Sequence, residues 1–406
     1  MKIFFTLVLF IGLIGSAAAQ RQCGTMDYKR SQPSVLLQSP QTLAAARDTT
    51  ANEIITIPVV VHVLYNTDEQ NISDEQIHSQ ITALNLDFRK QNYNIGNVPA
   101  QFAKVAGDAK INFTLAVTDP RGNSTNGIIR KQTSVQQWDA DDAMKFSAAR
   151  GDNGWDANNY LNIWICNLSG RSLGYASLPG TDLSKDGIVI QYTAFGTTGA
   201  VKAPFNKGRT LTHETGHWLG LMHIWGDNNC GDDKIGDTPP QQAYNNGCPS
   251  FPHLSSCSAD ANGDMFMNFM DFTNDDCMSM FTNGQKNKMR SLFAKGGSRN
   301  SLLVSPGNKP ATGEAKPTAP VEIITNKATI SFYPNPAKEK ITFNKASIED
   351  LNGQSVYIYN SLGRQVLATK VNTENPSVAV SNLSSGIYIV KIGAGKNTTT
   401  LKLVKD

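Results

Sequence analysis

The segment LTHETGHWLGLMHIWG (residues 211–226) contains three of the six histidines of a 406-residue chain, His213, His217 and His223. His213 and His217 are four positions apart, so on a helix their side chains share one face. Gly220 can adopt the left-handed conformation that ends a helix and turns the chain back. The pattern therefore predicts a helix that stops at Gly220 and three imidazoles around one metal ion.

A glutamate, Glu214, follows the first histidine and lies about 100° around the helix from it, beside the metal without binding it. Three imidazoles leave a tetrahedral zinc with one open position for water, which distinguishes a catalytic site from a closed structural one. Zinc lowers the pKa of that water to about 7. We expect Glu214 to act as general base and then as proton donor to a leaving amine. The alternative, ordinary helix and loop histidines, does not explain five specified residues at fixed spacing.

The composition is that of a globular protein, with 40% hydrophobic and 17% charged residues. The length allows two or three domains. A net charge of +3 gives no basic field that would favour nucleic acid. We expect a monomer with no nucleic-acid partner.

The first 19 residues have the layout of a secretory signal peptide, with Lys2 before an apolar run that ends in small residues. The run is too short to span a bilayer comfortably. The mature protein is therefore predicted to be exported, where its cysteines meet an oxidising environment. Residues 20–51 are interpreted as a pro-segment and residues 298–322, rich in Gly, Ser, Pro and Lys, as a linker.

Residues 52–297 are predicted to form one α+β domain with a mixed sheet and packed helices. The β-branched run at 54–65 is typical of a buried strand. A helix follows, with Ser73 as N-cap and Gln76 completing a capping box. Further strands are expected within 111–117, 160–168 and 187–192, and a last helix within 285–295. Residues 226–264, dense in Asp, Asn, Gly, Pro and Cys, predict an irregular lower part.

The spacing His213-Glu214-x-x-His217-x-x-Gly220-x-x-His223 resembles the signature of the metzincin metallopeptidases. MNFMDF (residues 267–272) resembles their methionine turn, with Met270 beneath the metal. The segments GHWLGLMHIWG, GDTPPQ and IPVVVHVLY narrow the resemblance to the pappalysin family, in its cytophagalysin branch. The resemblance implies a secreted zinc endopeptidase that hydrolyses protein substrates, with the metal in a cleft between an upper α/β part and the lower irregular part.

One position departs from the family pattern. Many metzincins place a tyrosine two residues after the turn methionine, where this chain has Phe272. A step assisted by a phenol at that position is therefore not expected.

Two other functions remain open. The first is a zinc-containing adhesin or binding protein without turnover, and Glu214 argues against it because loss of catalysis most often removes that residue. The second is a zinc hydrolase of a non-peptide bond, which the length of the peptidase-like sequence disfavours.

Six cysteines allow fifteen pairings if all are bridged. The family resemblance implies two disulfides, Cys230 with Cys257 and Cys248 with Cys277. Cys166 lies among apolar residues and is predicted to be a buried free thiol. A Cys23 thiolate could fill the open zinc position and keep the enzyme latent, a role that the resemblance supports. A bridge from Cys23 to Cys166, or a thiol without a role, is the alternative.

Residues 226–241 form a turn-rich loop with many oxygen ligands, which a calcium ion prefers. The candidate ligands are Asp227, Asp232, Asp233, Asp237 and Thr238. The family resemblance also implies a structural calcium in this region, but only loosely. The alternative is a solvated acidic loop without a metal. Residues 260–264 are a weaker second candidate.

Two further expectations concern cleavage. Activation requires a cut between the pro-segment and the first strand, and the small, polar residues 43–50 suit a cut near Arg47. Substrate preference after the scissile bond depends on residues 273–280. Within them, Asp275 or Asp276 would favour a basic side chain.

Residues 323–406 alternate short strands with turn residues, which predicts a small all-β sandwich. The segments FYPNPAKEKITF and LSSGIYIVKI resemble the sorting domain of the type IX secretion system of Bacteroidetes. The resemblance implies that the secretion machinery is a partner and that the protein is secreted or held at the cell surface. From the residues alone, a carbohydrate-binding or adhesive sandwich fits equally.

Overall fold

The computed structural model describes residues 21–31, 53–258, 261–311, 332–343, 354–360, 365–371, 376–392 and 399–406. The predicted signal peptide, the cut near Arg47 and residues 312–322 of the predicted linker lie outside these residues. The chain divides into two compact units, Met1–Ala315 and Lys316–Asp406, and each is described by itself. Within the described ranges, no helix has both the length and the apolarity that crossing a bilayer requires.

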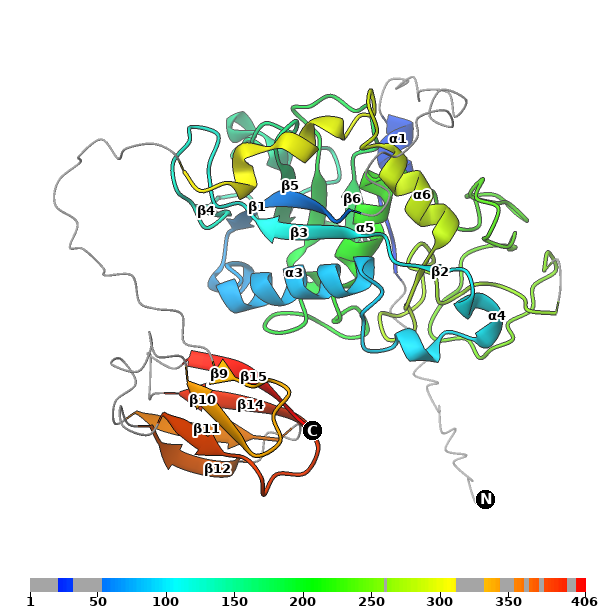
Figure 1. Cartoon of the computed structure of the whole chain (residues 1–406). Coiled ribbons are helices and arrows are strands. Elements are labelled where there is room, and N and C mark those ends of the chain that lie inside the picture. The colour runs from blue at the N-terminus through cyan, green and yellow to red at the C-terminus, as the bar shows by residue number, and fades with distance from the viewer. Residues whose placement is uncertain are drawn as a thin grey trace, which may run out of the picture. The chain divides into compact units, whose positions relative to one another are not determined.

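A six-stranded sheet forms the centre of the first unit (Figure 1). Its strands are β1 (Ile55–Tyr65), β3 (Ile111–Leu115), β4 (Ile128–Gln132), β5 (Leu161–Cys166), β6 (Gly174–Ala176) and β7 (Ile188–Gln191). The order is β3-β1-β5-β7-β6, and β4 also pairs with β1. All pairings are parallel except that of β6 with β7, which is antiparallel. The antiparallel strand β6 therefore forms one edge of the sheet.

Both faces of the sheet are covered, as a parallel sheet requires, and β5 is buried along its whole length. On one face, α3 (Asp74–Phe88) and α5 (Arg209–Trp218) pack against alternate residues of β1. On the other face, Trp164 and Tyr175 pack with Trp138 and Met144 from a long loop. This double burial explains why the strands are continuous apolar runs in the sequence.

The start of α3 differs from the predicted capping box. Ser73 caps the helix as expected, accepting from the backbone N–H of Gln76 at 3.2 Å. The Gln76 side chain does not return to the cap. Its amide donates to the carbonyl of Phe195 at 2.8 Å and accepts from the N–H of Ala200 at 2.9 Å. Because these backbone groups are partly buried and require partners, Gln76 ties the loop after β7 to α3 instead.

The rest of the first unit is made of short elements joined by irregular loops. They are α4 (Ala100–Ala103), β2 (Ala106–Gly107), β8 (Phe281–Thr282), α6 (Asn283–Ser291) and the 3₁₀ turns η1 (Asp68–Gln70), η2 (Ile95–Asn97), η3 (Ala143–Lys145), η4 (Ser147–Ala149), η5 (Tyr192–Ala194), η6 (Asn300–Val304) and η7 (Pro306–Asn308). A complete capping box starts α6, in which Thr282 and Gln285 satisfy each other's backbone N–H. The helix expected within 285–295 thus begins two residues earlier.

The chain does not leave the first unit at residue 298, where the sequence placed the linker. Leu302 of η6 is buried in the main core, and the carbonyl of Gly307 accepts from Val117 N–H at 2.8 Å. The sequence did not predict this packing because Leu302 is an apolar residue within a segment rich in Gly and Ser. Residues 298–311 therefore pack against the sheet.

The second unit is the all-β sandwich that the sequence predicted. One sheet has three strands in the order β13 (Ser377–Ala379), β10 (Lys340–Phe343) and β9 (Phe332–Tyr333). The other has four strands in the order β12 (Gln365–Lys370), β11 (Ser355–Tyr359), β14 (Gly386–Ile392) and β15 (Thr399–Lys405). Ile341 and Val378 of one sheet share a buried cluster with Ile358 and Val390 of the other. This unit has its own core.

Candidate metal centre

The three histidines meet because α5 ends where the sequence predicted. The helix stops at Trp218, and Gly220 has a φ of +81°, the left-handed region in which glycine is favoured. The turn places Nε2 of His217 3.2 Å from Nε2 of His213 and 3.0 Å from Nε2 of His223. All three rings are buried. The structure thus brings together the three predicted metal ligands.

The other nitrogen of each ring fixes its orientation. Nδ1 of His213 lies 2.7 Å from the carbonyl oxygen of Phe269, and Nδ1 of His217 lies 2.9 Å from that of Leu221. Nδ1 of His223 lies 2.6 Å from Oδ1 of Asp227. Because these partners are acceptors, each Nδ1 carries the proton and each Nε2 presents a lone pair. Three lone pairs that face one another in a buried site repel unless a cation lies between them. This donor set fits zinc.

Electrostatics keep the rings in the form that binds metal. Burial lowers the pKa of His213, and the neighbouring imidazoles lower it further. Burial and the adjacent His223 likewise lower the pKa of His217. Both rings are therefore neutral near physiological pH.

Cys23 is the fourth ligand group at this point. Its Sγ and the three histidine nitrogens all lie within 4.8 Å of one another. In the parts of the chain that the structure describes, no other set of three or more His, Cys, Asp or Glu side chains is close enough to hold a metal. Burial, and then the charge of Glu214, raise the pKa of the Cys23 thiol. A thiolate is favourable there only with a cation among the imidazoles.

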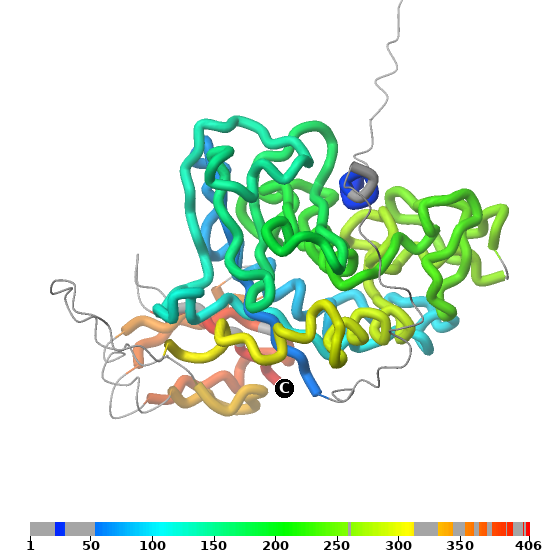
Figure 2. The backbone as a smooth tube through the Cα atoms, turned by 90° about the horizontal axis from the view of Figure 1, so that it is seen from above, coloured from blue at the N-terminus to red at the C-terminus, as the bar shows by residue number. Residues whose placement is uncertain are grey.

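The N-terminal segment reaches the metal centre by adding to the edge strand. Cys23 bridges Gly174 of β6 in parallel: Gly24 N–H donates to the Gly174 carbonyl and Leu173 N–H to the Gln22 carbonyl, both at 2.9 Å. Helix α1 (Thr25–Ser31) follows at once. In Figure 2, α1 (dark blue) lies between the green segments near the sheet and the yellow-green loops.

Glu214 lies beside the histidines and is covered by the same segment. Its Oε2 accepts a 2.8 Å hydrogen bond from the Thr25 hydroxyl. The Thr25 hydroxyl oxygen in turn accepts from the backbone N–H of Ala176 in β6 at 2.9 Å. Burial raises the pKa of Glu214 to about 7, and hydrogen bonds from Thr25 and Cys23 act against this shift. β6 passes so close that a Cβ at Gly174 would lie 3.4 Å from Glu214 Cγ.

An arginine of the N-terminal segment occupies a buried acidic pocket. Arg21 forms an ion pair with Asp275 Oδ1. It also donates to Thr210 Oγ1 at 3.1 Å and to the Thr273 carbonyl at 3.3 Å. Asp275 is fully buried and Arg21 is 2% exposed. Sequence reasoning did not identify Arg21, although its place two residues before Cys23 was a signal.

The two acids that the sequence singled out have different partners. Asp276 accepts from the Tyr93 hydroxyl at 2.9 Å, whereas Asp275 holds Arg21. The second oxygen of Asp275 accepts from the backbone N–H of Lys207 at 2.7 Å and of Arg209 at 3.3 Å. Only Asp275 therefore forms the base of the arginine pocket.

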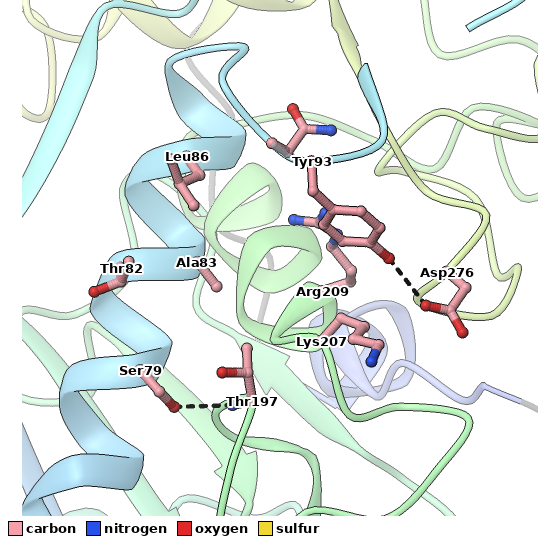
Figure 3. Close-up of a pocket in the computed structure, with 10 residues that line it drawn as sticks. Ser79, Thr82, Ala83, Leu86, Tyr93, Thr197, Lys207, Arg209 and Asp276 are labelled. Atoms are coloured by element: carbon pink, nitrogen blue, oxygen red, sulfur yellow. Dashed lines mark hydrogen bonds between the residues drawn. The ribbon is translucent and has the colours of Figure 1, made fainter. Parts of the chain in front are cut away.

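A separate cavity of about 420 Å³ lies next to this loop. It is lined by Ser79, Thr82, Ala83, Leu86, Asn92, Tyr93, Thr197, Lys207, Arg209 and Asp276. Figure 3 shows Tyr93 beside Arg209, with its hydroxyl directed to Asp276. None of the metal-centre residues lines this cavity.

The methionine turn lies directly beneath α5. Met270 is fully buried, and a Cβ added at Gly216 would collide with its sulfur. Two residues further on, the Phe272 ring lies 5.6 Å from that of His213 and 4.9 Å from that of His223. Phe272 is thus an apolar wall against two of the predicted metal ligands.

Asp271, which sequence reasoning passed over, anchors this turn. Its carboxylate accepts from Asn245 N–H at 2.7 Å, from Asn245 Nδ2 at 2.8 Å and from Gln241 Nε2 at 3.0 Å. Burial raises its pKa to about 6. A buried carboxylate within MNFMDF therefore connects the turn to the loop at 241–245.

The five candidate calcium ligands serve separate partners. Asp227 orients His223, Asp232 pairs with Lys234 at 3.0 Å, Asp233 accepts from Thr238 Oγ1 at 2.5 Å, and Asp237 accepts from Thr282 Oγ1 at 2.6 Å. Only Asp233 and Thr238 contact each other. Calcium in this loop stays a prediction.

Two disulfides cross-link the irregular part, Cys230–Cys257 and Cys248–Cys277, the pairs that the family resemblance implied. Cys23 and Cys166 are free thiols, and Cys166 is buried. The second disulfide ends next to Asp275 and Asp276, so it restrains the loop that forms the arginine pocket.

Two family models match the chain. Residues 147–294 match the model described as Pregnancy-associated plasma protein-A. Residues 331–406 match a secretion system C-terminal sorting domain. The second match covers the β-sandwich, so the protein is directed to the cell surface or beyond.

The chain is also similar to secreted proteases along most of its first unit. An extracellular metalloprotease of Arthroderma benhamiae is 32% identical over 296 residues, 70% of this chain and 95% of that protein. Mature mirolysin of Tannerella forsythia, solved with a cleaved peptide, is 50% identical with a TM-score of 0.62, covering 64% of this chain and 99% of that one. A promirolysin variant is 45% identical with a TM-score of 0.66, covering 72% and 100%.

Proposed function

This chain is a secreted metalloprotease of the pappalysin family, and on that basis we propose that it is a zinc endopeptidase, latent as made, that cleaves before basic side chains. The observation that carries the proposal is the convergence of three Nε2 lone pairs beside Glu214. A relative solved with a cleaved peptide supports peptide hydrolysis.

His213, His217 and His223 would hold the metal. A zinc ion bound by three imidazoles supplies a Lewis acid and a water acidified to a pKa near 7. Glu214 takes the proton from the attacking water and returns it to the leaving amine. In the described proform its Oε2 is occupied by Thr25, so this base becomes available only when the pro-segment leaves.

The edge strand β6 would bind the substrate backbone. Leu173 N–H and the Gly174 carbonyl pair with the pro-segment, and an extended peptide can use the same groups by strand addition. Gly174 lets β6 lie close to β7, because a Cβ there would meet Val189 and Ile190. The scissile bond is thereby carried past Glu214.

Cys23 would keep the enzyme latent. Its sulfur lies in the ligand cluster, where a thiolate fills the position that water needs. The similarity to a promirolysin structure supports a zymogen. The backbone bonds of Gln22 and Gly24 to β6 hold the thiol in place.

The arginine pocket would select the residue after the scissile bond. Asp275 is fully buried, and a buried carboxylate without a partner is costly. When Arg21 leaves with the pro-segment, an arginine or lysine of the substrate restores that partner. Selection for a basic side chain follows directly from this cost.

Replacement of the base tests the activity. We expect Glu214→Ala to abolish casein hydrolysis by the activated enzyme, a loss of 10²- to 10⁴-fold or more, while zinc content stays at one per chain. A zinc chelator should abolish the wild-type activity. Retained cleavage in Glu214→Ala would refute the assigned base, and an inactive wild type with bound zinc would favour the binding-protein alternative.

A further inference from the structure

A second pocket on the metalloprotease unit is filled by Tyr28 of α1. This side chain is 3% exposed. Its hydroxyl donates to Asp142 Oδ2 at 2.7 Å, and its ring lies 5.0 Å from the ring of Tyr175 on β6. Met144 and Trp164 belong to the same buried cluster as Tyr28. We call these four catalytic-unit residues, together with Lys145, the Tyr28 pocket.

The pocket is charged as well as aromatic. Lys145 Nζ lies 2.8 Å from Asp142 Oδ1 and 5.5 Å from the centre of the Tyr28 ring, and it donates to the Lys185 carbonyl at 2.6 Å. Both members of the pair are buried, at 0% and 1% exposure. Burying an ion pair costs more than burying apolar side chains of the same size. With Oδ1 of Asp142 engaged by Lys145, its Oδ2 is the oxygen that meets the Tyr28 hydroxyl.

The backbone at Asp142 is also unusual. Its φ is +70°, a left-handed conformation that is uncommon outside glycine, although Asp tolerates it better than most residues, and that is concentrated at functional sites. The Tyr175 hydroxyl donates to Asp142 Oδ1 at 3.1 Å. The catalytic unit therefore positions this carboxylate through its own residues, and Tyr28 is the one pocket occupant that departs with the pro-segment.

The position of the pocket relative to the metal follows from the order of the pro-segment. Arg21, before Cys23, fills the pocket of Asp275, which the proposed function assigns to the residue after the scissile bond. Tyr28, after Cys23, lies on the opposite side, against Tyr175 of β6. A substrate that places its basic residue against Asp275 runs opposite to the pro-segment. Its residues before the scissile bond therefore face the Tyr28 pocket.

We propose that the Tyr28 pocket of the mature enzyme is a second specificity site, which binds a tyrosine side chain of the substrate on the N-terminal side of the scissile bond. This inference rests on the proposed function. The phenol donates to Asp142, the ring packs at a tilt against Tyr175, and the ammonium of Lys145 lies over the ring, where its charge is attracted to the aromatic face. Phenylalanine binds less well because it leaves the buried Asp142 oxygen without a donor.

The distance along the substrate can be bounded. Tyr28 lies three residues into a helix after Thr25, and a helix rises 1.5 Å per residue whereas an extended chain rises about 3.3 Å. An extended substrate covers the same path in fewer residues. We expect the tyrosine roughly three to five residues before the scissile bond.

Binding of pro-segment peptides tests the pocket without altering the enzyme. Peptides of residues 20–31 are titrated by calorimetry into mature Glu214→Ala enzyme, so that no turnover is required. We expect Tyr28→Ala to weaken binding at least 30-fold and Tyr28→Phe about tenfold. Gln22→Ala is the matched control, because Gln22 pairs with β6 through its backbone. A Tyr28→Ala peptide that binds as tightly as the control would overturn the proposal.

Cleavage of substrate peptides tests specificity in the active enzyme. Fluorogenic peptides keep arginine after the scissile bond and carry one tyrosine at the second to sixth position before it, in a Ser/Ala background. We expect one position at which tyrosine raises kcat/KM about tenfold over alanine and at least threefold over phenylalanine. A flat profile, with cleavage still before arginine, would overturn the pocket but leave the proposed function intact. Absence of cleavage in every peptide would instead contradict the proposed function, and the binding titration would then decide the pocket alone.

Discussion

We propose that latency depends on Cys23. Its sulfur lies within 4.8 Å of the histidine nitrogens. We expect the Cys23→Ala proform, loaded with zinc, to hydrolyse a small fluorogenic peptide before any processing, at a rate at least tenfold above the wild-type proform. Alanine leaves the water position open, whereas the thiolate fills it.

The control for this change is Cys166→Ala. Cys166 is the other free thiol, fully buried and not a member of the ligand cluster. Its proform should remain as latent as the wild type. Equal latency in Cys23→Ala and Cys166→Ala would refute the switch.

The proposed preference for a basic residue is assigned to Asp275, which pairs with Arg21. We expect Asp275→Asn to lower kcat/KM for peptides with arginine after the scissile bond about 100-fold, because loss of one partner of a buried charge pair costs 2–5 kcal/mol. Peptides with leucine there should change little. Asp276→Asn is the matched control, since Asp276 faces Tyr93. A similar loss in both variants, or in neither, would show that the Asp275 carboxylate does not select the substrate.

Among the site residues, the sequence predicted those that lie close together along the chain. His213, Glu214, His217 and Gly220 act through helix geometry, which spacing alone specifies. Arg21 and Asp275 are 254 positions apart, so only the folded chain could join them. The roles of Asp142 and Lys145 were equally invisible, because an acid and a lysine in a polar loop look like solvated surface.

The edge strand β6 is an element that the sequence did not predict. It has three residues and β7 is its one neighbour within the sheet, and GYA lacks the β-branched residues typical of strands. The longer apolar strands β1, β5 and β7 were predicted to within a few residues because burial on both faces produces continuous apolar runs.

The role of β6 can be tested at Gly174. A Cβ there would lie 2.7 Å from the Val189 carbonyl oxygen and 2.8 Å from Ile190 Cδ1. We expect Gly174→Ala to destabilise the protein by about 1–3 kcal/mol and to lower kcat/KM by displacing the strand that binds substrate. At Gly96 an added methyl meets nothing within 4 Å, so Gly96→Ala should leave calorimetric and kinetic values unchanged. Wild-type kcat/KM in Gly174→Ala would remove β6 from substrate binding.

The methionine turn should make stability depend on pH. Burial raises the pKa of Asp271 to about 6 from 3.8, so between these values the folded state holds a proton that the unfolded state has lost. The free energy of unfolding therefore decreases as pH rises from about 4 to about 6. The shift of two units corresponds to roughly 3 kcal/mol.

Urea unfolding between pH 4 and 7.5 isolates this contribution when wild type is compared with Asp271→Asn. Asparagine has no charge to bury, and the amides of Gln241 and Asn245 can turn to accept from it. The difference between the two proteins should grow in favour of the variant as pH rises. Parallel curves would contradict the assignment.

The whole molecule consists of two units with separate cores. The β-sandwich matches a secretion sorting domain, and the metal centre contains no residue from the described part of this unit. We expect a chain that ends at Ala315 to keep the unfolding temperature and peptidase activity of the first unit but to remain inside the cell. Cell fractionation of a producing strain would measure how much of the shortened chain, and of the full chain, leaves the cell. Undiminished export, or a lower unfolding temperature, would contradict independence of the two units.

The division into units was predictable because composition changes along the chain, from mixed helix and strand patterns to short alternating strands. The precise end of the first unit was not, since Leu302 and Gly307 bind the sheet from within a Gly/Ser/Pro-rich stretch. One apolar anchor in a polar segment has no periodicity to reveal it.

X-ray absorption at the zinc edge examines the metal centre before and after activation. One zinc per chain with three nitrogen ligands and one sulfur at about 2.3 Å is expected in the proform, and the sulfur should be replaced by a lighter atom once the pro-segment is removed. A proform spectrum without sulfur, or a mature spectrum that retains it, would contradict a three-histidine zinc site closed by Cys23.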